Sequence, residues 1–247
     1  MNKSAPKVKR IVDPPKKKMK PLHPNVPQTP ALVLLIMPVK CGKSTIISNM
    51  LLNDNFYGQD YFDNVKVIST TINNDLTSRF LKQAYDCEDY YDDNMISSIV
   101  KSQKKFGEVS NMPLQALIVD DCLGEKTPAL TKLSSRYRHS NIGLLAISSQ
   151  AIKKVAPTIR ANATNCFIGK LTSSMELDKV CDEYAQMYAD ERGGDHNFRD
   201  LYNKATEKKY DFLHLNLQEN PAEAFINMET KIWPPEKSEP EPEILNE

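Results

Sequence analysis

The stretch that most constrains the fold of this chain runs from Ala31 to Thr45 and reads ALVLLIMPVKCGKST. An apolar run is followed by a short polar loop and then by Gly-Lys-Ser-Thr, which opens an amphipathic segment. This order predicts a buried strand, a loop and the start of a helix. The first backbone N–H groups of a helix are unpaired and carry a partial positive charge, so an anion fits there. The stretch therefore predicts a phosphate-binding loop.

The residue types in this loop suit a nucleotide. Gly42 lets the backbone approach phosphate oxygens, Lys43 can place its charge on the β- and γ-phosphates, and Ser44 can offer its hydroxyl to Mg²⁺. The motif G-x-x-x-x-G-K-[ST] has a glycine where this chain has Met37, so we expect Pro38 to shape the first turn instead. The predicted nucleotide-binding residues are Pro38, Val39, Lys40, Cys41, Gly42, Lys43, Ser44 and Thr45.

A second apolar segment, Gln115–Asp121, reads QALIVDD and ends in two aspartates. Its continuous apolar run predicts a strand buried in a parallel sheet. Ligands of open α/β sheets bind at the C-terminal ends of such strands, so both carboxylates should lie beside the phosphate loop. We expect Asp120 to hold Mg²⁺ through water and Asp121 to polarise an attacking water as general base.

Polar residues also flank a third apolar strand, predicted over Leu144–Gln150. Gln150 ends this strand, and its amide could donate to a γ-phosphate and accept from water. Arg136 and Arg138 come just before the strand. Arginine presents a rigid fork to phosphate and is the residue that commonly stabilises a transferring phosphate across a subunit interface. The simpler interpretation of these arginines is a basic helix end that complements the helix dipole.

Composition limits the classes of protein to which the chain can belong. The 247 residues are 40% hydrophobic, enough for one sizeable core, and no apolar run approaches the roughly 18–20 residues that span a bilayer. Residues 1–30 hold eight basic residues and seven prolines, which predicts a disordered basic arm. We therefore expect an ATPase domain over 31–232 and an acidic, proline-rich tail over 233–247. Five cysteines without metal-ligand spacing indicate reduced thiols in an intracellular protein.

Periodicity indicates the remaining elements. It predicts further strands at Val65–Thr70 and Asn165–Leu171 and a solvated loop over Cys87–Asn94. The pair Tyr210–Leu217 and Ala224–Met228 should form a hairpin. Helical patterns are found at Asp75–Tyr85, Met95–Phe106, from about Thr127, Ser173–Glu191 and Asn197–Lys208.

Four features now occur in one order. They are a strand leading into GKST, a strand ending in Asp-Asp, an RYRH segment before a strand ending in Gln, and a following PTIRAN. This set resembles the genome-packaging ATPases of large DNA viruses and virophages, the poxvirus-type branch of the FtsK–HerA superfamily. The resemblance covers about residues 31–171, and Tyr137 stands where that family usually has glycine.

The resemblance implies an α/β fold, the P-loop NTPase three-layer sandwich. It implies a mostly parallel five-stranded core sheet with helices on both faces, plus a C-terminal helical and β-hairpin extension. The implied activity is hydrolysis of ATP with Mg²⁺ by a homo-oligomeric ring that moves double-stranded DNA, whatever its sequence, into a capsid. The ring would dock on a capsid or vertex protein and act in a host cytoplasm or viral factory, or be associated with the virion.

Carried over by motif, the resemblance also assigns roles to single residues. It implies that Lys43 and Ser44 bind nucleotide and Mg²⁺ and that Asp120 belongs to the Mg²⁺ site. It also implies that Asp121 is the catalytic acidic residue and that Gln150 senses phosphate. Arg136 or Arg138 would act in the site of a neighbouring subunit.

Two other functions remain open at this stage. A P-loop kinase of small molecules would need a lid, commonly basic, and the stretch after Leu171 shows none. A nucleotide-binding adaptor or structural ring subunit with weak hydrolysis is the other alternative. Met37 is the reason to retain the adaptor as an alternative, because a distorted phosphate loop can bind ATP and turn it over slowly.

Overall fold

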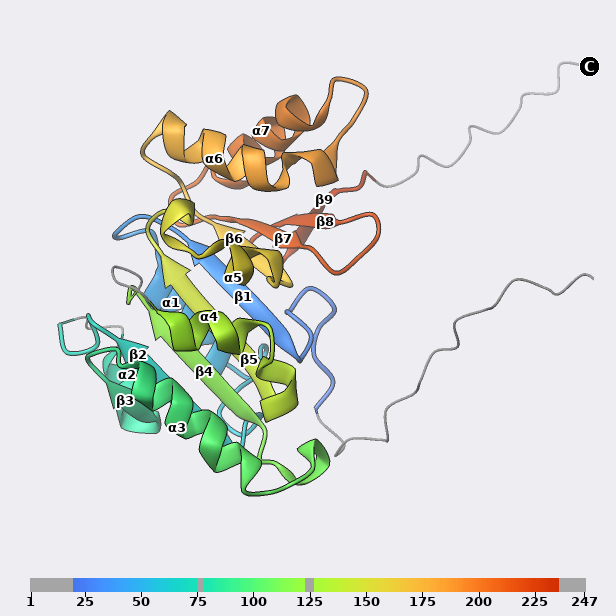
Figure 1. The fold of residues 1–247 in the computed structure, drawn as a ribbon. Helices are drawn as coiled ribbons and strands as arrows, with labels where there is room; N and C mark the ends of the chain where they lie inside the picture. The colour runs from blue at the N-terminus through green and yellow to red at the C-terminus, as the bar shows by residue number, and fades with distance from the viewer. Residues whose placement is uncertain (1–19, 75–77, 123–126, 236–247) are drawn as a thin grey trace, which may run out of the picture.

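The computed structural model describes residues 20–74, 78–122 and 127–235, and they form one large sheet between two layers of helices (Figure 1). Within these residues the sheet has nine strands in the order β3-β2-β4-β5-β1-β6-β7-β8-β9. The first six in this order are parallel, and the last three add antiparallel. The strands are β1 (Ala31–Ile36), β2 (Asn64–Ser69), β3 (Asp86–Glu88), β4 (Gln115–Asp120), β5 (Ile142–Ser149), β6 (Asn165–Ile168), β7 (Leu213–Asn216), β8 (Glu223–Ile226) and β9 (Thr230–Trp233).

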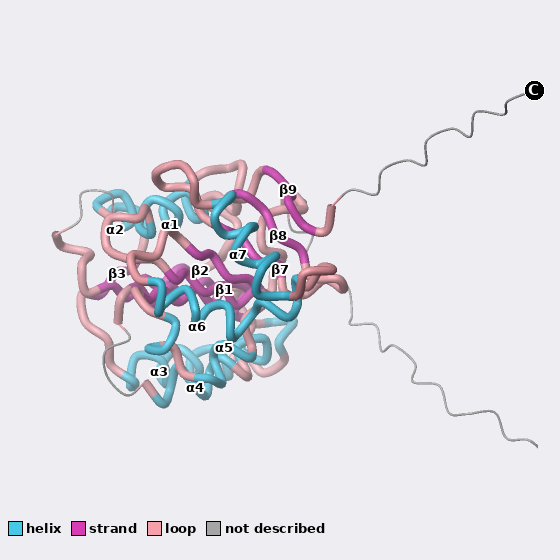
Figure 2. The backbone as a smooth tube through the Cα atoms, turned by 90° about the horizontal axis from the view of Figure 1, so that it is seen from above, coloured by secondary structure: helices cyan, strands magenta, loops and turns pink. Residues whose placement is uncertain are grey.

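Helices cover both faces of this sheet, as Figure 2 shows from above. α1 and α2 contribute buried residues to one apolar core, and α3 to α7 contribute to the other. The predicted three-layer α/β fold is therefore confirmed, although the sheet is larger than five strands. The helices are α1 (Lys43–Leu52), α2 (Arg79–Ala84), α3 (Asp93–Lys104), α4 (Pro128–Ser134), α5 (Pro157–Ala161), α6 (Ser174–Tyr184) and α7 (Gly194–Ala205).

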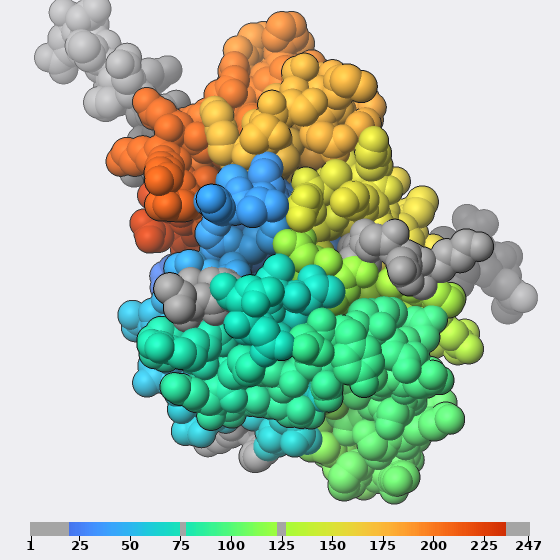
Figure 3. Space-filling view, turned by 90° about the vertical axis from the view of Figure 1, so that its left-hand side faces the viewer, coloured from blue at the N-terminus to red at the C-terminus, as the bar shows by residue number. Residues whose placement is uncertain are grey.

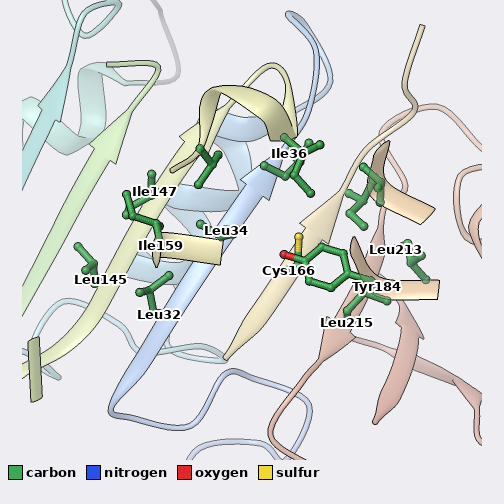
Figure 4. Close-up of a cluster of buried hydrophobic side chains, with 14 of the residues drawn as sticks. Leu32, Leu34, Ile36, Leu145, Ile147, Ile159, Cys166, Tyr184, Leu213 and Leu215 are labelled. Carbon is green, nitrogen blue, oxygen red and sulfur yellow. The ribbon is translucent and has the colours of Figure 1, made fainter. Parts of the chain in front are cut away.

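The central strand β1 is buried on both sides because its apolar run is uninterrupted. Successive side chains of a strand point to opposite faces. Leu32, Leu34 and Ile36 accordingly pack into the core beneath α5 and α6, where Figure 4 shows them beside Ile147 and Ile159. The alternate residues Ala31, Val33 and Leu35 pack into the core beneath α1, and each is fully buried. Each buried valine, leucine or isoleucine side chain contributes about 1.5–3 kcal/mol, so β1 anchors both layers.

The structure corrects the predicted solvated loop over Cys87–Asn94. Its first residues belong to β3, which pairs in parallel with the edge of β2. Lys66 of β2 lies between the carboxylates of Asp86 and Glu88, with Nζ–O distances of 2.7 and 3.0 Å. This short strand is acidic and shows no alternation of apolar and polar residues, so the local sequence carried no strand signal. Its pairing depends on Lys66, twenty positions before Asp86.

The chain begins to pack before the boundary expected at residue 30. Val26 is 3% exposed and belongs to the core beneath α1. The Tyr57 hydroxyl donates to the carbonyl of Pro27 at 2.6 Å, and the hydroxyls of Thr29 and Tyr61 lie 3.0 Å apart. The chain therefore packs against the domain before β1 begins. The remainder of the predicted arm, 1–19, and most of the predicted tail, 236–247, lie outside the described residues.

The C-terminal part follows the predicted helical and hairpin pattern. β7 and β8 form the expected antiparallel pair, and β9 extends it. The start of α7 needs glycine, because its N-cap Gly193 has φ +98° and a Cβ on Gly194 would stand 2.6 Å from the carbonyl oxygen of Ala185. All five cysteines are unpaired. None of the helices in the described ranges has the length and apolarity to cross a membrane.

Met37 continues the course of β1 toward the phosphate loop. Its N–H donates to the carbonyl of Ser149 at 3.0 Å, and its side chain is fully buried. Gly169 follows β6 on the neighbouring strand, and a Cβ there would stand 3.0 Å from Met37 Cγ and 3.3 Å from its Cβ. The absence of a side chain at Gly169 thus makes room for the methionine that replaces a glycine in the loop motif.

This packing predicts a strong coupling between positions 37 and 169. We expect Gly169→Ala to lower the free energy of unfolding by about 1–3 kcal/mol, because the added methyl overpacks the site. Met37→Ala removes Cγ, the atom that the added methyl approaches most closely, and keeps Cβ, so in that background most of the cost should disappear. Chemical denaturation of the four chains of this double-mutant cycle measures the coupling. Additive effects would contradict the proposed complementarity.

His214 is a buried histidine in the middle of β7. It is 1% exposed, its ring stacks on Phe225 and meets the edge of Phe167, and its Nε2 lies 3.0 Å from Asn165 Nδ2. Burial lowers the pKa of His214 from its ordinary 6.5 to about 3. The folded protein therefore holds this imidazole neutral where the unfolded chain would protonate it.

Stability should consequently fall on acidification. Between pH 6.5 and about 3 the unfolded chain binds a proton at His214 and the native state does not. The free energy of unfolding therefore falls as the pH falls across this range, by up to about 1.4 kcal/mol per pH unit. Denaturant melts of the wild type and of His214→Gln between pH 7.5 and 4.5 test this. The glutamine keeps a polar partner for Asn165 but cannot titrate, so its melts should show a shallower pH dependence. Equal slopes would assign the acid lability to other groups.

Candidate active site

The chain forms a phosphate loop between β1 and α1. Two residues of the loop have left-handed backbone, Lys40 at φ +63° and Gly42 at φ +92°. The sharp turn thus lies at these two residues rather than at Pro38, where the sequence placed it. Gly42 is the N-cap of α1, and no side chain caps the helix. The first N–H groups of α1 are therefore free of side-chain caps and suited to an anion.

Lys43 places a buried positive charge inside this loop. The residue is 7% exposed, and its ammonium donates to the carbonyl of Met37 at 3.0 Å. The same Nζ forms an ion pair with Asp121 Oδ2 at 3.0 Å. A buried charge is costly unless it is paired, so this carboxylate balances the lysine.

Asp120 ends β4 and is 4% exposed. One carboxylate oxygen accepts a hydrogen bond from the Ser69 hydroxyl at 2.8 Å, and the other accepts from the Ser148 hydroxyl. Burial raises the pKa of Asp120, and the two hydroxyl hydrogen bonds oppose that rise. The carboxylate is thus fixed in orientation by residues of the strands on both sides of β4.

Asp121 turns away from the strand. Its φ of +50° places it in the left-handed region, and its N–H donates to Ser148 Oγ at 3.0 Å. Ser148 therefore binds the side chain of one aspartate and the backbone of the next. This turn directs the Asp121 carboxylate to Lys43, while Asp120 stays inside the sheet.

Sequence reasoning missed Ser69 and Ser148. A signal was present, because each is a hydroxyl residue at the end of an apolar strand that borders β4. Ser69 pairs with Asp120 in the β2–β4 register, and Ser148 lies on β5 one residue beyond the last β4–β5 pair, Val119 with Ile147. Using that signal required the strand order, which the sequence alone did not provide.

The residues present fit a Mg²⁺–nucleotide complex. Ser44 and Asp120 line one narrow pocket together with Ser69. Hydroxyl and carboxylate oxygens are the ligands that Mg²⁺ prefers, and it commonly keeps waters and binds substrate phosphates. Over the described ranges, no three His, Cys, Asp or Glu side chains form a metal cage of their own, so phosphate oxygens would have to complete the coordination.

The other predicted residues fall at two different edges of the sheet, the edge where the parallel strands end and the edge where they begin. Gln150 follows β5 directly and is exposed at the same edge as the phosphate loop. Arg136 and Arg138 precede β5 and are exposed at the opposite edge, and Arg138 lies over the ring of Tyr137. The eight residues of β5 separate the two edges by roughly 25 Å. Neither arginine can therefore reach the phosphate loop of its own chain.

Comparison with known proteins gives matches among solved structures alone. No protein-family model and no curated protein sequence matches the chain. The genome packaging NTPase B204 from Sulfolobus turreted icosahedral virus 2, in complex with ATP-gammaS, superposes with a TM-score of 0.54 at 18% identity, covering 80% of this chain and 96% of that one. The cytoplasmic domain of the Thermomonospora curvata type VII secretion ATPase EccC has a TM-score of 0.54 at 11% identity, covering 84% of this chain and 26% of that one.

A third solved structure, the pCW3 conjugation coupling protein TcpA with ATPgS, matches with a TM-score of 0.50 at 13% identity and covers 77% of this chain and 57% of that one. These similarities extend well beyond the phosphate loop, since each spans more than three quarters of the chain. The chain therefore has the P-loop NTPase fold seen in a viral genome packaging NTPase, as its sequence motifs predicted.

Proposed function

We propose that the protein is an ATP hydrolase that drives double-stranded DNA into a capsid. The observation that carries this proposal is the Lys43–Asp121 ion pair, which lies at the phosphate loop beside the buried Asp120. The fold shared with B204, whose structure was determined as a genome packaging NTPase with ATP-gammaS, supports the same conclusion.

The ion pair suggests how binding prepares the site. The terminal phosphates of ATP offer Lys43 several negative oxygens in place of one carboxylate. Binding would thus release Asp121 from the lysine and leave its carboxylate beside the γ-phosphate, where it can orient water and accept a proton. Mg²⁺, held by Ser44 and through water by Asp120, would neutralise charge on the phosphates. Gln150 lies at the same edge and is the proposed phosphate sensor.

Double-stranded DNA is the proposed cargo. A motor that moves a whole genome cannot depend on base sequence, so its contacts should be with backbone phosphates. A homo-oligomeric ring and a capsid or vertex protein as its docking partner complete the proposal.

The proposed function makes a prediction about turnover. We expect ATP hydrolysis that rises with protein concentration and with added double-stranded DNA. Lys43→Ala should abolish turnover and weaken nucleotide binding. Asp121→Asn should keep nucleotide binding and lower kcat by about 10²–10⁴-fold, because the general base is lost while the fold and Lys43 are retained. Steady-state phosphate release and equilibrium binding of an ATP analogue measure the two effects.

Lys104→Ala is the matched control, since Lys104 is an exposed lysine on α3. It should leave turnover unchanged. A turnover rate that does not change when DNA is added would contradict a DNA motor. It would favour an enzyme that transfers phosphate to a small molecule, such as a P-loop kinase. Nucleotide binding without any turnover would favour the adaptor.

A further prediction concerns the arginines. Because Arg136 and Arg138 lie at the far edge of their own sheet, we propose that one of them serves the site of a neighbouring subunit. Removing that arginine by an Arg→Ala substitution should lower kcat by about 10³-fold or more. Mixing this variant with Lys43→Ala should restore turnover, since an intact phosphate loop and an intact arginine then meet at mixed interfaces.

Lys132→Ala, an exposed lysine on the nearby helix α4, is the control for a change of surface charge. Full activity of both arginine variants would exclude the proposed role. Loss of activity that mixing cannot restore would indicate a role within one subunit.

A further inference from the structure

The loop between α7 and β7 places an aromatic side chain against the phosphate loop. Tyr210 Cδ1 lies 3.9 Å from the position that a Cβ would take on Gly42. Tyr210 is nevertheless 58% exposed, so much of its ring is open to solvent. Neither the phosphate chemistry nor the packing of the core uses this ring.

The backbone holds Tyr210 in a position that a bulky residue adopts at a cost. Its φ is +75°, in the left-handed region. The residues that follow it are fixed, because Asn227 accepts from the N–H of Phe212 at 3.1 Å and donates to Asp211 at 3.0 Å. Phe212 in turn packs on Phe167, with ring centroids 5.1 Å apart. Tyr210 is thus attached to a firmly held segment.

The strand order shows which part of a nucleotide would reach this ring. Asp120 and Asp121 lie at the end of β4, two strands to one side of β1, whereas β7 lies two strands to the other side. β7 begins at the phosphate edge, because Leu213 pairs with Ile168, the last residue of β6. Figure 3 shows the orange C-terminal part of the chain beside the blue N-terminal part on this face. A nucleotide whose terminal phosphate faces the aspartates therefore extends its base toward β7.

We propose that the ring of Tyr210 is the stacking surface for the base of the bound nucleotide, an inference that rests on the proposed binding of ATP at the phosphate loop. Lys209 lies over one face of the ring, with Nζ 4.7 Å from its centroid. The base is assigned to the other face. Stacking accepts any base, so Tyr210 adds affinity for nucleosides and leaves discrimination between bases to other contacts.

The experiment separates the base from the phosphates. Calorimetry on the full chain with Mg²⁺ compares a non-hydrolysable ATP analogue with inorganic tripolyphosphate. We expect Tyr210→Ala to lower the affinity for the analogue about tenfold and to leave the affinity for tripolyphosphate unchanged, since only the analogue has a base to stack. Tyr210→Phe keeps the ring and should bind both like the wild type. Tyr90→Ala should also bind both ligands like the wild type. It removes a tyrosine that is 55% exposed elsewhere on the surface.

Each other outcome overturns the inference. Unchanged affinity of Tyr210→Ala for the analogue would show that the base does not stack there. Equal weakening of both ligands would show that Tyr210 supports the phosphate loop instead. If the wild type bound tripolyphosphate and the analogue equally well, no base site would exist, although the phosphate site would stand. If the wild type bound neither, the proposed function would fail as well.

Discussion

The buried ammonium of Lys43 is the charge on which the whole site depends. A lysine that is 7% exposed needs an anionic partner, and the geometry supplies one from β4. Asp121 can reach it because the chain leaves β4 with a left-handed residue, which Ser148 fixes through the backbone N–H. The same hydroxyl donates to Asp120. One serine on the intervening strand therefore sets the directions of both carboxylates, and an arriving phosphate would have to replace Asp121 at the lysine.

The sheet order then distributes the parts of the site. β1 lies between β5 and β6, with the aspartates beyond β5 and the hairpin of β7 beyond β6. All the parallel strands end at one edge, where α1 begins, whereas the residues that precede them lie at the far edge. This polarity brings Gln150 to the phosphate loop and keeps Arg136 and Arg138 away from it. A site that needs an arginine would have to obtain it from another subunit.

Local sequence patterns were sufficient where the physics is local. The continuous apolar runs of β1 and β4, the GKST turn and the Asp-Asp strand end predicted the fold class and the phosphate loop with its paired aspartates. Features that depend on distant partners were not readable. β3 forms because Lys66 binds Asp86 and Glu88. The segment before β1 packs because the Tyr57 hydroxyl donates to the carbonyl of Pro27 and the Tyr61 hydroxyl is hydrogen-bonded to that of Thr29. The register that brings Ser69 and Ser148 to Asp120 is likewise a property of the assembled sheet.

Met37 shows how the same limitation affects an inference about activity. Read alone, a methionine in place of the first glycine suggested a distorted loop and an adaptor with weak hydrolysis. In the phosphate loop of the folded chain, the residues with left-handed backbone are Lys40 and Gly42, whereas Met37 continues the strand. Its side chain enters space left by Gly169, and its carbonyl, which every residue possesses, accepts from Lys43. The substitution is thus absorbed by a neighbouring strand, outside the cradle that phosphate would occupy. Met37 by itself therefore gives no reason to expect slow turnover.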